Sequence, residues 1–201
     1  MSEKPWPSIA DLFSGTLMVF IVLTVILMIV PKFHEQNRIS TKLIKLASNI
    51  DKQKNIIEVD INNSKVILRD AFFETASACI SNSGKDAIPY ISNLIVDILT
   101  KNKKTLILIE GHADSRPVNR TINSCGFYFS DNMQLSTARS ISIRNEIIKY
   151  ITTNYDNGST LVEQIGENIG AAGYGDLKPV DKKNPENPLN RRVEIRIINV
   201  D

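Results

Sequence analysis

The chain has 201 residues, and its 24 lysines and arginines nearly balance its 22 aspartates and glutamates, for a net charge of +2. That small charge argues against nucleic acid as a partner. The two cysteines form no C-x-x-C pair, and the sequence contains no nucleophile-elbow, zinc or phosphate motif. We therefore expect no enzyme, no metal site and no bound cofactor.

An apolar segment lies near the amino terminus. Leu12 to Val30 carries no charge, and a helix of that length rises about 28 Å, close to the ~30 Å hydrocarbon core of a bilayer. The run is long for a signal peptide, and no small-x-small cleavage site follows it. We predict a cytoplasmic tail over residues 1–10 and an uncleaved transmembrane helix over 11–31.

A single carboxylate, Asp11, stands at the start of this segment. An ionisable group at membrane depth is a candidate for function, because it can take up H⁺ or Na⁺ on one side and release it on the other. Alternatively, Ser8 caps the helix and Asp11 interacts with the first-turn amides. Ser14 and Thr16 either line the ion path or serve in packing.

Basic residues are concentrated after the apolar segment. Lys4 precedes it, whereas four more follow within about 15 residues, namely Lys32, Arg38, Lys42 and Lys45. By the positive-inside rule, this asymmetry favours a cytoplasmic carboxy-terminal domain.

Residues 32–55 are predicted to form a helical linker. Its apolar positions follow steps of 4, 3 and 4 residues, the spacing of a coiled-coil seam, at Ile39, Leu43, Leu46 and Ile50. This pattern favours a homodimer. The alternative is an amphipathic helix that lies on the membrane or on its own domain.

Strands and helices alternate over residues 56–201. Apolar runs or period-2 alternation predict strands, and a 3.6-residue period predicts helices. We expect a hairpin over 56–68, a helix over 84–100, a strand over 105–109, a helix over 135–150, a strand within 164–175 and a last strand over 193–197. The predicted fold class is an α/β sandwich, with one mixed sheet and helices on one face.

Three polar stretches stand at the ends of these elements. Residues 109–114 (IEGHAD) place Asp114 past a strand, residues 132–139 (NMQLSTAR) place Arg139 early in a helix, and residues 190–195 (NRRVEI) carry Arg191 toward the last strand. An aspartate and an arginine across one crevice can bind a zwitterion through its ammonium and its carboxylate. Alternatively, Asp114 and Arg139 only pair with each other.

These stretches resemble the OmpA-like peptidoglycan-binding domain, whose pattern runs G-H-T-D, N-x-x-L-S-x-x-R-A, G-Y-G-x-x-x-P and N-R-R-V-E. The resemblance covers about residues 65–199 and implies a β-α-β-α-β fold that holds the diaminopimelate of the cell-wall stem peptide. It assigns Asp114 and Arg139 to grip that group, and Asn132 and Arg191 to flank it. Ala113 departs from the pattern, which has threonine there.

The amino-terminal residues 5–12 (PWPSIADL) are similar to the [WY]-x-x-[FY]-A-D-[LMF] signature of MotB-type stator subunits, although Ile9 replaces the usual aromatic residue. That resemblance implies a single-pass inner-membrane protein with a periplasmic domain, two copies of which sit within a pentamer of a MotA-like (or ZorA-like) subunit. Asp11 is then the ion acceptor of a rotary motor.

The short tail and linker look most like ZorB of the Zorya anti-phage systems. A flagellar stator subunit and a passive OmpA-like wall tether are the alternatives.

The two cysteines fall in loops that the OmpA-like fold brings to the ligand end of the sheet. On this resemblance a disulfide between Cys79 and Cys125 is expected, and two unpaired thiols are the alternative.

Overall fold

The computed structural model describes residues 6–50, 56–118 and 122–200. The chain divides into two compact units, residues 1–39 and residues 40–201.

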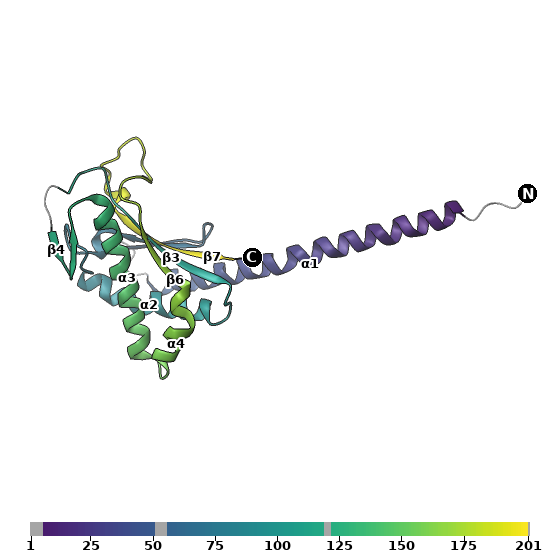
Figure 1. Cartoon of the computed structure of the whole chain (residues 1–201), viewed down its shortest axis with the longest axis horizontal. Coiled ribbons are helices and arrows are strands. Elements are labelled where there is room, and N and C mark those ends of the chain that lie inside the picture. The colour runs from purple at the N-terminus through teal and green to yellow at the C-terminus, as the bar shows by residue number, and fades with distance from the viewer. Residues whose placement is uncertain (1–5, 51–55, 119–121, 201) are drawn as a thin grey trace, which may run out of the picture. The chain divides into compact units, whose positions relative to one another are not determined.

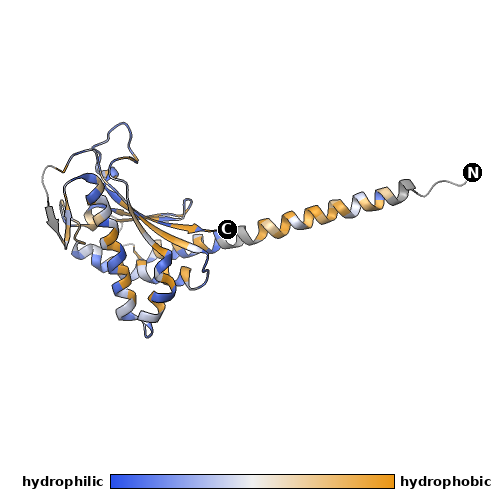
Figure 2. Cartoon of the chain, viewed as in Figure 1, coloured by the Kyte–Doolittle hydropathy of each residue, from blue (hydrophilic) through white to orange (hydrophobic). Residues whose placement is uncertain are grey.

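The first unit consists of most of helix α1 (Trp6–Asn49), which continues into the second unit. Within it, Ala10–Val30 has a mean hydropathy of 2.7 and is long and apolar enough to cross a membrane (Figure 2). Ser8 lies within the described part of this helix. The role of Asp11, as an ion acceptor or as a partner of the first-turn amides, stays a prediction.

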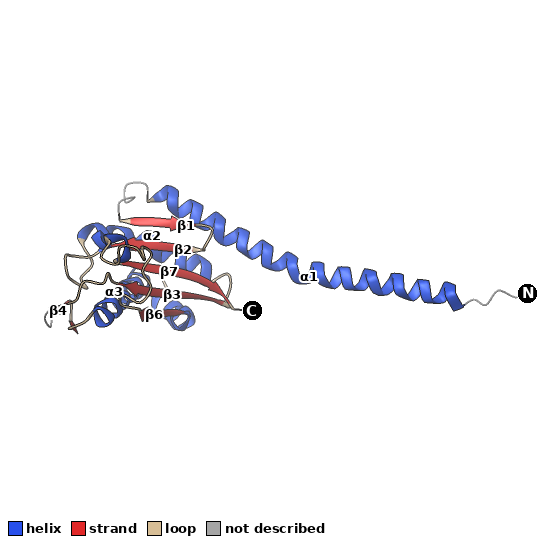
Figure 3. Cartoon of the chain, turned by 90° about the horizontal axis from the view of Figure 1, so that it is seen from above, coloured by secondary structure: helices blue, strands red, loops and turns tan. Residues whose placement is uncertain are grey.

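The second unit is built on a five-stranded mixed sheet, with the strands in the order β1-β2-β7-β3-β6 (Figure 3). The bounds are β1 Ile57–Asp60, β2 Lys65–Arg69, β3 Thr105–His112, β6 Ile169–Gly173 and β7 Arg192–Asn199. Strands β3 and β6 run parallel, and the other pairs are antiparallel. The predicted α/β class with one mixed sheet is confirmed.

Helices α2 (Asn82–Leu99), α3 (Asn132–Asn154) and α4 (Gly158–Ile165) accompany this sheet (Figure 1). Side-chain oxygens cap the first two helices: Ser81 accepts from the Gly84 amide at 3.1 Å, and Asp131 from the Gln134 amide at 2.7 Å. The core is largely isoleucine, including Ile91, Ile107, Ile109, Ile143 and Ile195.

Close packing between β3 and α3 depends on a glycine. A Cβ atom at Gly111 would overlap the carbonyl oxygen of Ser136 on α3. The odd-numbered positions of β3 therefore face α3, and the even-numbered side chains point to the opposite face of the sheet.

Shorter elements complete the domain. They are the 3₁₀ turns Asp70–Phe72, Gly166–Asn168 and Pro188–Asn190, and a separate hairpin formed by β4 (Ile122–Ser124) and β5 (Phe127–Phe129). Neither this hairpin nor α4 was predicted from the sequence.

Residues of the predicted coiled-coil seam pack inside the second unit. Leu43, Leu46 and Ile50 are buried within the single chain. In the same turns, the Lys42 ammonium donates to the carbonyl oxygen of Asp97 on α2 at 2.7 Å. Of the two alternatives for this segment, packing on its own domain describes these residues, and the homodimer remains a prediction.

Candidate functional site

Asp114 lies two residues beyond the end of β3. The Ala113 amide donates to the Gly175 carbonyl at 2.8 Å and so fixes the chain beside the end of β6. The Asp114 side chain is almost completely buried, and its Oδ2 accepts from Arg191 Nη1 at 2.7 Å and from Arg116 Nε at 2.8 Å. Asp114 is therefore held between two guanidinium groups.

Arg139 lies in the second turn of α3 and is only 3% exposed. Its Nε donates to the Ser77 carbonyl at 2.9 Å, its Nη1 donates to Asp70 Oδ1 at 3.0 Å, and its guanidinium lies 4.9 Å from the centre of the Phe73 ring. Burial lowers the pKa of Arg139, and the Asp70 carboxylate opposes that effect.

Asp70 joins Asp114 and Arg139, the two groups that the sequence motifs predict to bind ligand. Its Oδ1 accepts from Arg139, and its Oδ2 accepts from Arg191 Nε at 2.9 Å. Arg191 in turn binds Asp114, so Asp114 and Arg139 are linked through Asp70 and Arg191 rather than paired directly. We call Asp70, Asp114, Arg116, Arg139 and Arg191 the arginine–aspartate network. The alternative in which Asp114 and Arg139 only pair with each other is wrong.

Neither Asp70 nor Arg116 was predicted from the sequence, and Arg191 was predicted to flank the site. Arg191 instead bridges both aspartates. Partial burial acts to lower its pKa, but the hydrogen bonds to Asp114 and Asp70 outweigh burial and raise the pKa above its ordinary value.

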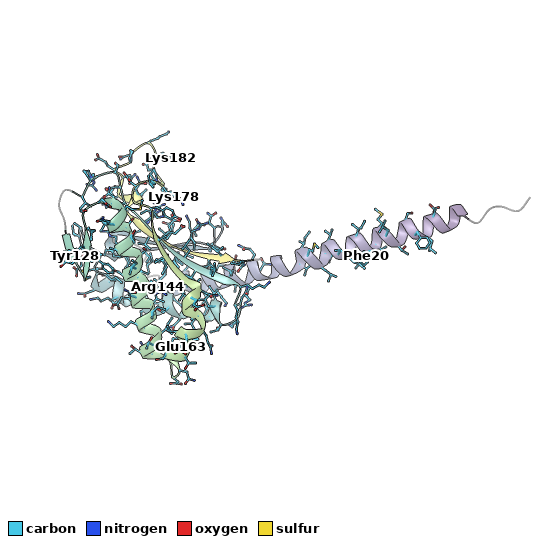
Figure 4. All side chains as sticks on the ribbon, viewed as in Figure 1. Phe20, Tyr128, Arg144, Glu163, Lys178 and Lys182 are labelled. Atoms are coloured by element: carbon cyan, nitrogen blue, oxygen red, sulfur yellow. A yellow bond between two sulfur atoms is a disulfide. The ribbon has the colours of Figure 1, made fainter. Side chains whose placement is uncertain are left out.

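Two asparagines hold the backbone around the network. The Asn132 side-chain amide donates to the carbonyls of Asp114 and Arg116, both at 3.0 Å. Asn190 is fully buried, and its Oδ1 accepts from the Val180 amide at 2.8 Å. Asn190 thus secures the loop between β6 and β7, part of which Lys178 and Lys182 mark in Figure 4.

The network can exchange partners with a zwitterionic ligand. It contains three arginines and two aspartates, so its formal charge is +1. Asp70 and Arg116 have partly exposed side chains, whereas those of Asp114 and Arg139 are buried. An incoming carboxylate can bind the exposed guanidinium groups, and an ammonium can bind Asp70.

A disulfide closes one side of this region. Cys79 and Cys125 are joined with an S–S distance of 2.02 Å and a Cα–Cα distance of 5.4 Å. Cys79 follows Ser77, whose carbonyl accepts from Arg139, and Cys125 lies in the turn between β4 and β5. The bond therefore ties the loop that supports Arg139 to the β4–β5 hairpin.

The membrane candidates lie in the first unit. Asp11, Ser14 and Thr16 are exposed on α1. The Ser14 hydroxyl donates to the Asp11 carbonyl at 3.1 Å, and the Thr16 hydroxyl donates to the Phe13 carbonyl at 3.0 Å. Both hydroxyl protons thus satisfy the helix backbone, which leaves the oxygen lone pairs facing outward.

The comparisons with known proteins agree with this fold. A model of the OmpA family matches residues 72–192. A putative MotB-like protein from Desulfovibrio vulgaris has a TM-score of 0.53 at 16% identity, over 82% of this chain and 94% of that chain. The cell wall anchor of the T6SS from Pseudomonas aeruginosa has a TM-score of 0.52 at 25% identity, over 79% of this chain and 97% of that chain.

The periplasmic domain of Helicobacter pylori MotB has a TM-score of 0.47 at 21% identity, over 68% of this chain and 76% of that chain. No curated protein matches the sequence.

Proposed function

Because the chain belongs to the OmpA family, we propose that its domain binds peptidoglycan and holds the diaminopimelate of the stem peptide at the arginine–aspartate network. The observation that carries the proposal is the bridge from Arg139 through Asp70 and Arg191 to Asp114. The bridge joins guanidinium and carboxylate groups in one hydrogen-bonded set. These groups can bind the carboxylate and the ammonium of a zwitterionic amino acid.

The network is preorganised for this task. Asp114 is held by Arg191 and Arg116, and its backbone carbonyl is held by Asn132. Ligand binding then replaces one set of charge-assisted hydrogen bonds with another and orders few new side chains, which limits its entropic cost.

We expect Asp114→Asn to weaken binding of the full-length protein, in detergent, to purified cell-wall sacculi by about tenfold or more, since loss of one charge-assisted bond costs about 1.5–3 kcal/mol. Cosedimentation measures the affinity. Asp156→Asn, an exposed aspartate between α3 and α4, is the matched control and should bind as the wild type does. If Asp114→Asn bound sacculi as tightly as Asp156→Asn and the wild type, Asp114 would have no role in binding.

We further propose that the chain is the B subunit of an ion-driven rotary motor in the inner membrane, with its domain in the periplasm. The support is the apolar helix Ala10–Val30, which carries Asp11 near its start and precedes a wall-binding domain. In this proposal Asp11 accepts H⁺ or Na⁺, Ser14 and Thr16 lie on the ion path, and a homodimer works within a MotA/ZorA-like pentamer.

Its finer assignment is a Zorya-type anti-phage system, and this rests on the short linker between the apolar segment and the domain. A flagellar stator is an alternative. A passive wall tether is a second candidate function, and the likeness to the T6SS cell wall anchor favours it, because that protein matches at 25% identity over 97% of its length.

Asp11→Asn in the native host separates these functions, because it keeps the size and polarity of the side chain but abolishes its titration. Loss of phage protection with normal swimming is the expected result for a defence motor. Loss of swimming would make the protein a flagellar stator. Blots of membrane fractions must show equal protein levels, and if both phenotypes survive, the protein is a tether.

A further inference from the structure

A second polar cluster lies on the face of the sheet opposite α3. Glu110 and His112 are even-numbered residues of β3, and Glu194 of β7 is the direct cross-strand partner of Glu110. Figure 3 shows the strands in front of α2 and α3. Because the odd-numbered positions of β3 face α3, the even-numbered ones lie on the opposite face of the sheet. All three side chains are buried, and one ligand atom from each lies within 4.8 Å of the others.

His112 is unusual within this cluster. It is 2% exposed, and among the described residues neither ring nitrogen has a hydrogen-bond partner. Its ring stacks on Tyr174 with centroids 5.4 Å apart, a contact that leaves the nitrogens unsatisfied. A buried polar atom without a partner costs about 1–3 kcal/mol, so such an atom calls for an explanation.

We propose that Glu110, His112 and Glu194 bind a divalent transition-metal ion of the Zn²⁺ class. One imidazole nitrogen and two carboxylate oxygens are ligands that Zn²⁺ accepts, and water can complete the coordination. A tetrahedral ion with bonds of about 2.0–2.2 Å places its ligands about 3.3–3.5 Å apart. The three ligand atoms lie within 4.8 Å of one another, so they need to close in by at most about 1.5 Å. The ion would fasten β3 to β7.

The protonation state of the histidine suits this role. Burial, with a smaller contribution from the Arg192 charge, lowers the pKa of His112 to about 4. The ring is therefore neutral at pH 7, as a metal ligand must be. Both cysteines are engaged in the disulfide, so no thiolate competes for the ion.

Neighbouring cations limit the affinity but leave coordination sites on both carboxylates. Glu194 accepts from Arg192 at 2.6 Å and from Lys65 at 3.2 Å. Glu110 accepts from the Tyr174 hydroxyl at 3.0 Å and forms an ion pair with Arg196 at 3.4 Å. Each ionised carboxylate offers about four lone-pair positions, so one remains for a metal bond beside these contacts.

The test is equilibrium dialysis of the full-length, chelator-stripped protein in detergent against Zn²⁺, with the bound metal measured by mass spectrometry. We expect one Zn²⁺ per chain in the wild type and loss of at least tenfold in affinity in Glu194→Gln. The control is His34→Asn, which removes the other histidine of the chain. It should retain full binding.

A second measurement needs no variant and so does not depend on the folding of Glu194→Gln. In the wild type, Zn²⁺ at about 100 times its Kd should raise the Tm by about 5–10 °C, and EDTA should reverse the shift. The proposal is overturned if Zn²⁺ does not bind, if binding is lost in His34→Asn, or if Glu194→Gln folds and binds Zn²⁺ as the wild type does.

Discussion

At the scale of single residues, Asp70 is the group on which the site depends. It faces two guanidinium groups, one of them the buried Arg139. We expect Asp70→Asn to lower the free energy of unfolding by about 1–3 kcal/mol, because Arg139 then keeps its charge without a carboxylate. Denaturant unfolding measures the change, with the exposed Asp86→Asn as the matched control. Equal stability of the two variants would mean that the carboxylate of Asp70 does not support Arg139.

The sequence could indicate Asp114 and Arg139 because both stand in recognisable motifs. It could not indicate Asp70 or the bridging position of Arg191. Asp70 lies 69 residues from Arg139 and 121 from Arg191, and no local pattern marks it. Only the pairing of β2 with β7 brings the end of one strand beside the start of the other.

At the scale of elements, the Cys79–Cys125 bond joins two loops that flank the network. We expect Cys79→Ser with Cys125→Ser to lower the free energy of unfolding by about 2–4 kcal/mol, because the cross-link restricts the unfolded chain over a sequence separation of 46. Thermal unfolding with and without reductant measures this. Two reactive thiols in the denatured, unreduced wild-type protein would contradict the bond.

The long elements were predictable and the short ones were not. The apolar period of residues 84–100 indicated α2, which spans Asn82–Leu99, because a long amphipathic face gives a strong pattern. Helix α4 has eight residues, and β4 and β5 have three each, too few for a periodic signal. Strand β3 extends to His112, past the predicted end at Ile109, because pairing with β7 continues through polar residues.

At the scale of the whole molecule, the last turns of α1 belong to the soluble domain. Leu43 is fully buried and its neighbour Ile44 is 55% exposed. We expect Leu43→Ala to lower the free energy of unfolding by about 2–5 kcal/mol, since it leaves a cavity, and Ile44→Ala, the matched control, to cost far less. Light scattering of the same variants in detergent reports their oligomeric state. If Leu43→Ala kept the stability of the wild type but converted a dimer into monomers, Leu43 would belong to a coiled-coil interface between two copies.

The disulfide also bears on which side of the membrane the domain occupies. Disulfides persist where thiols are oxidised and are rare in a reducing cytoplasm. The Cys79–Cys125 bond therefore supports the proposed periplasmic location against the basic residues that follow the apolar segment. On that proposal, the cross-link beside Arg139 forms in two steps, which are export of the chain and then oxidation of the two thiols. In a cell that exports the chain but cannot oxidise thiols, the Cys79–Cys125 bond would be missing, and the loop that supports Arg139 would not be cross-linked to the β4–β5 hairpin.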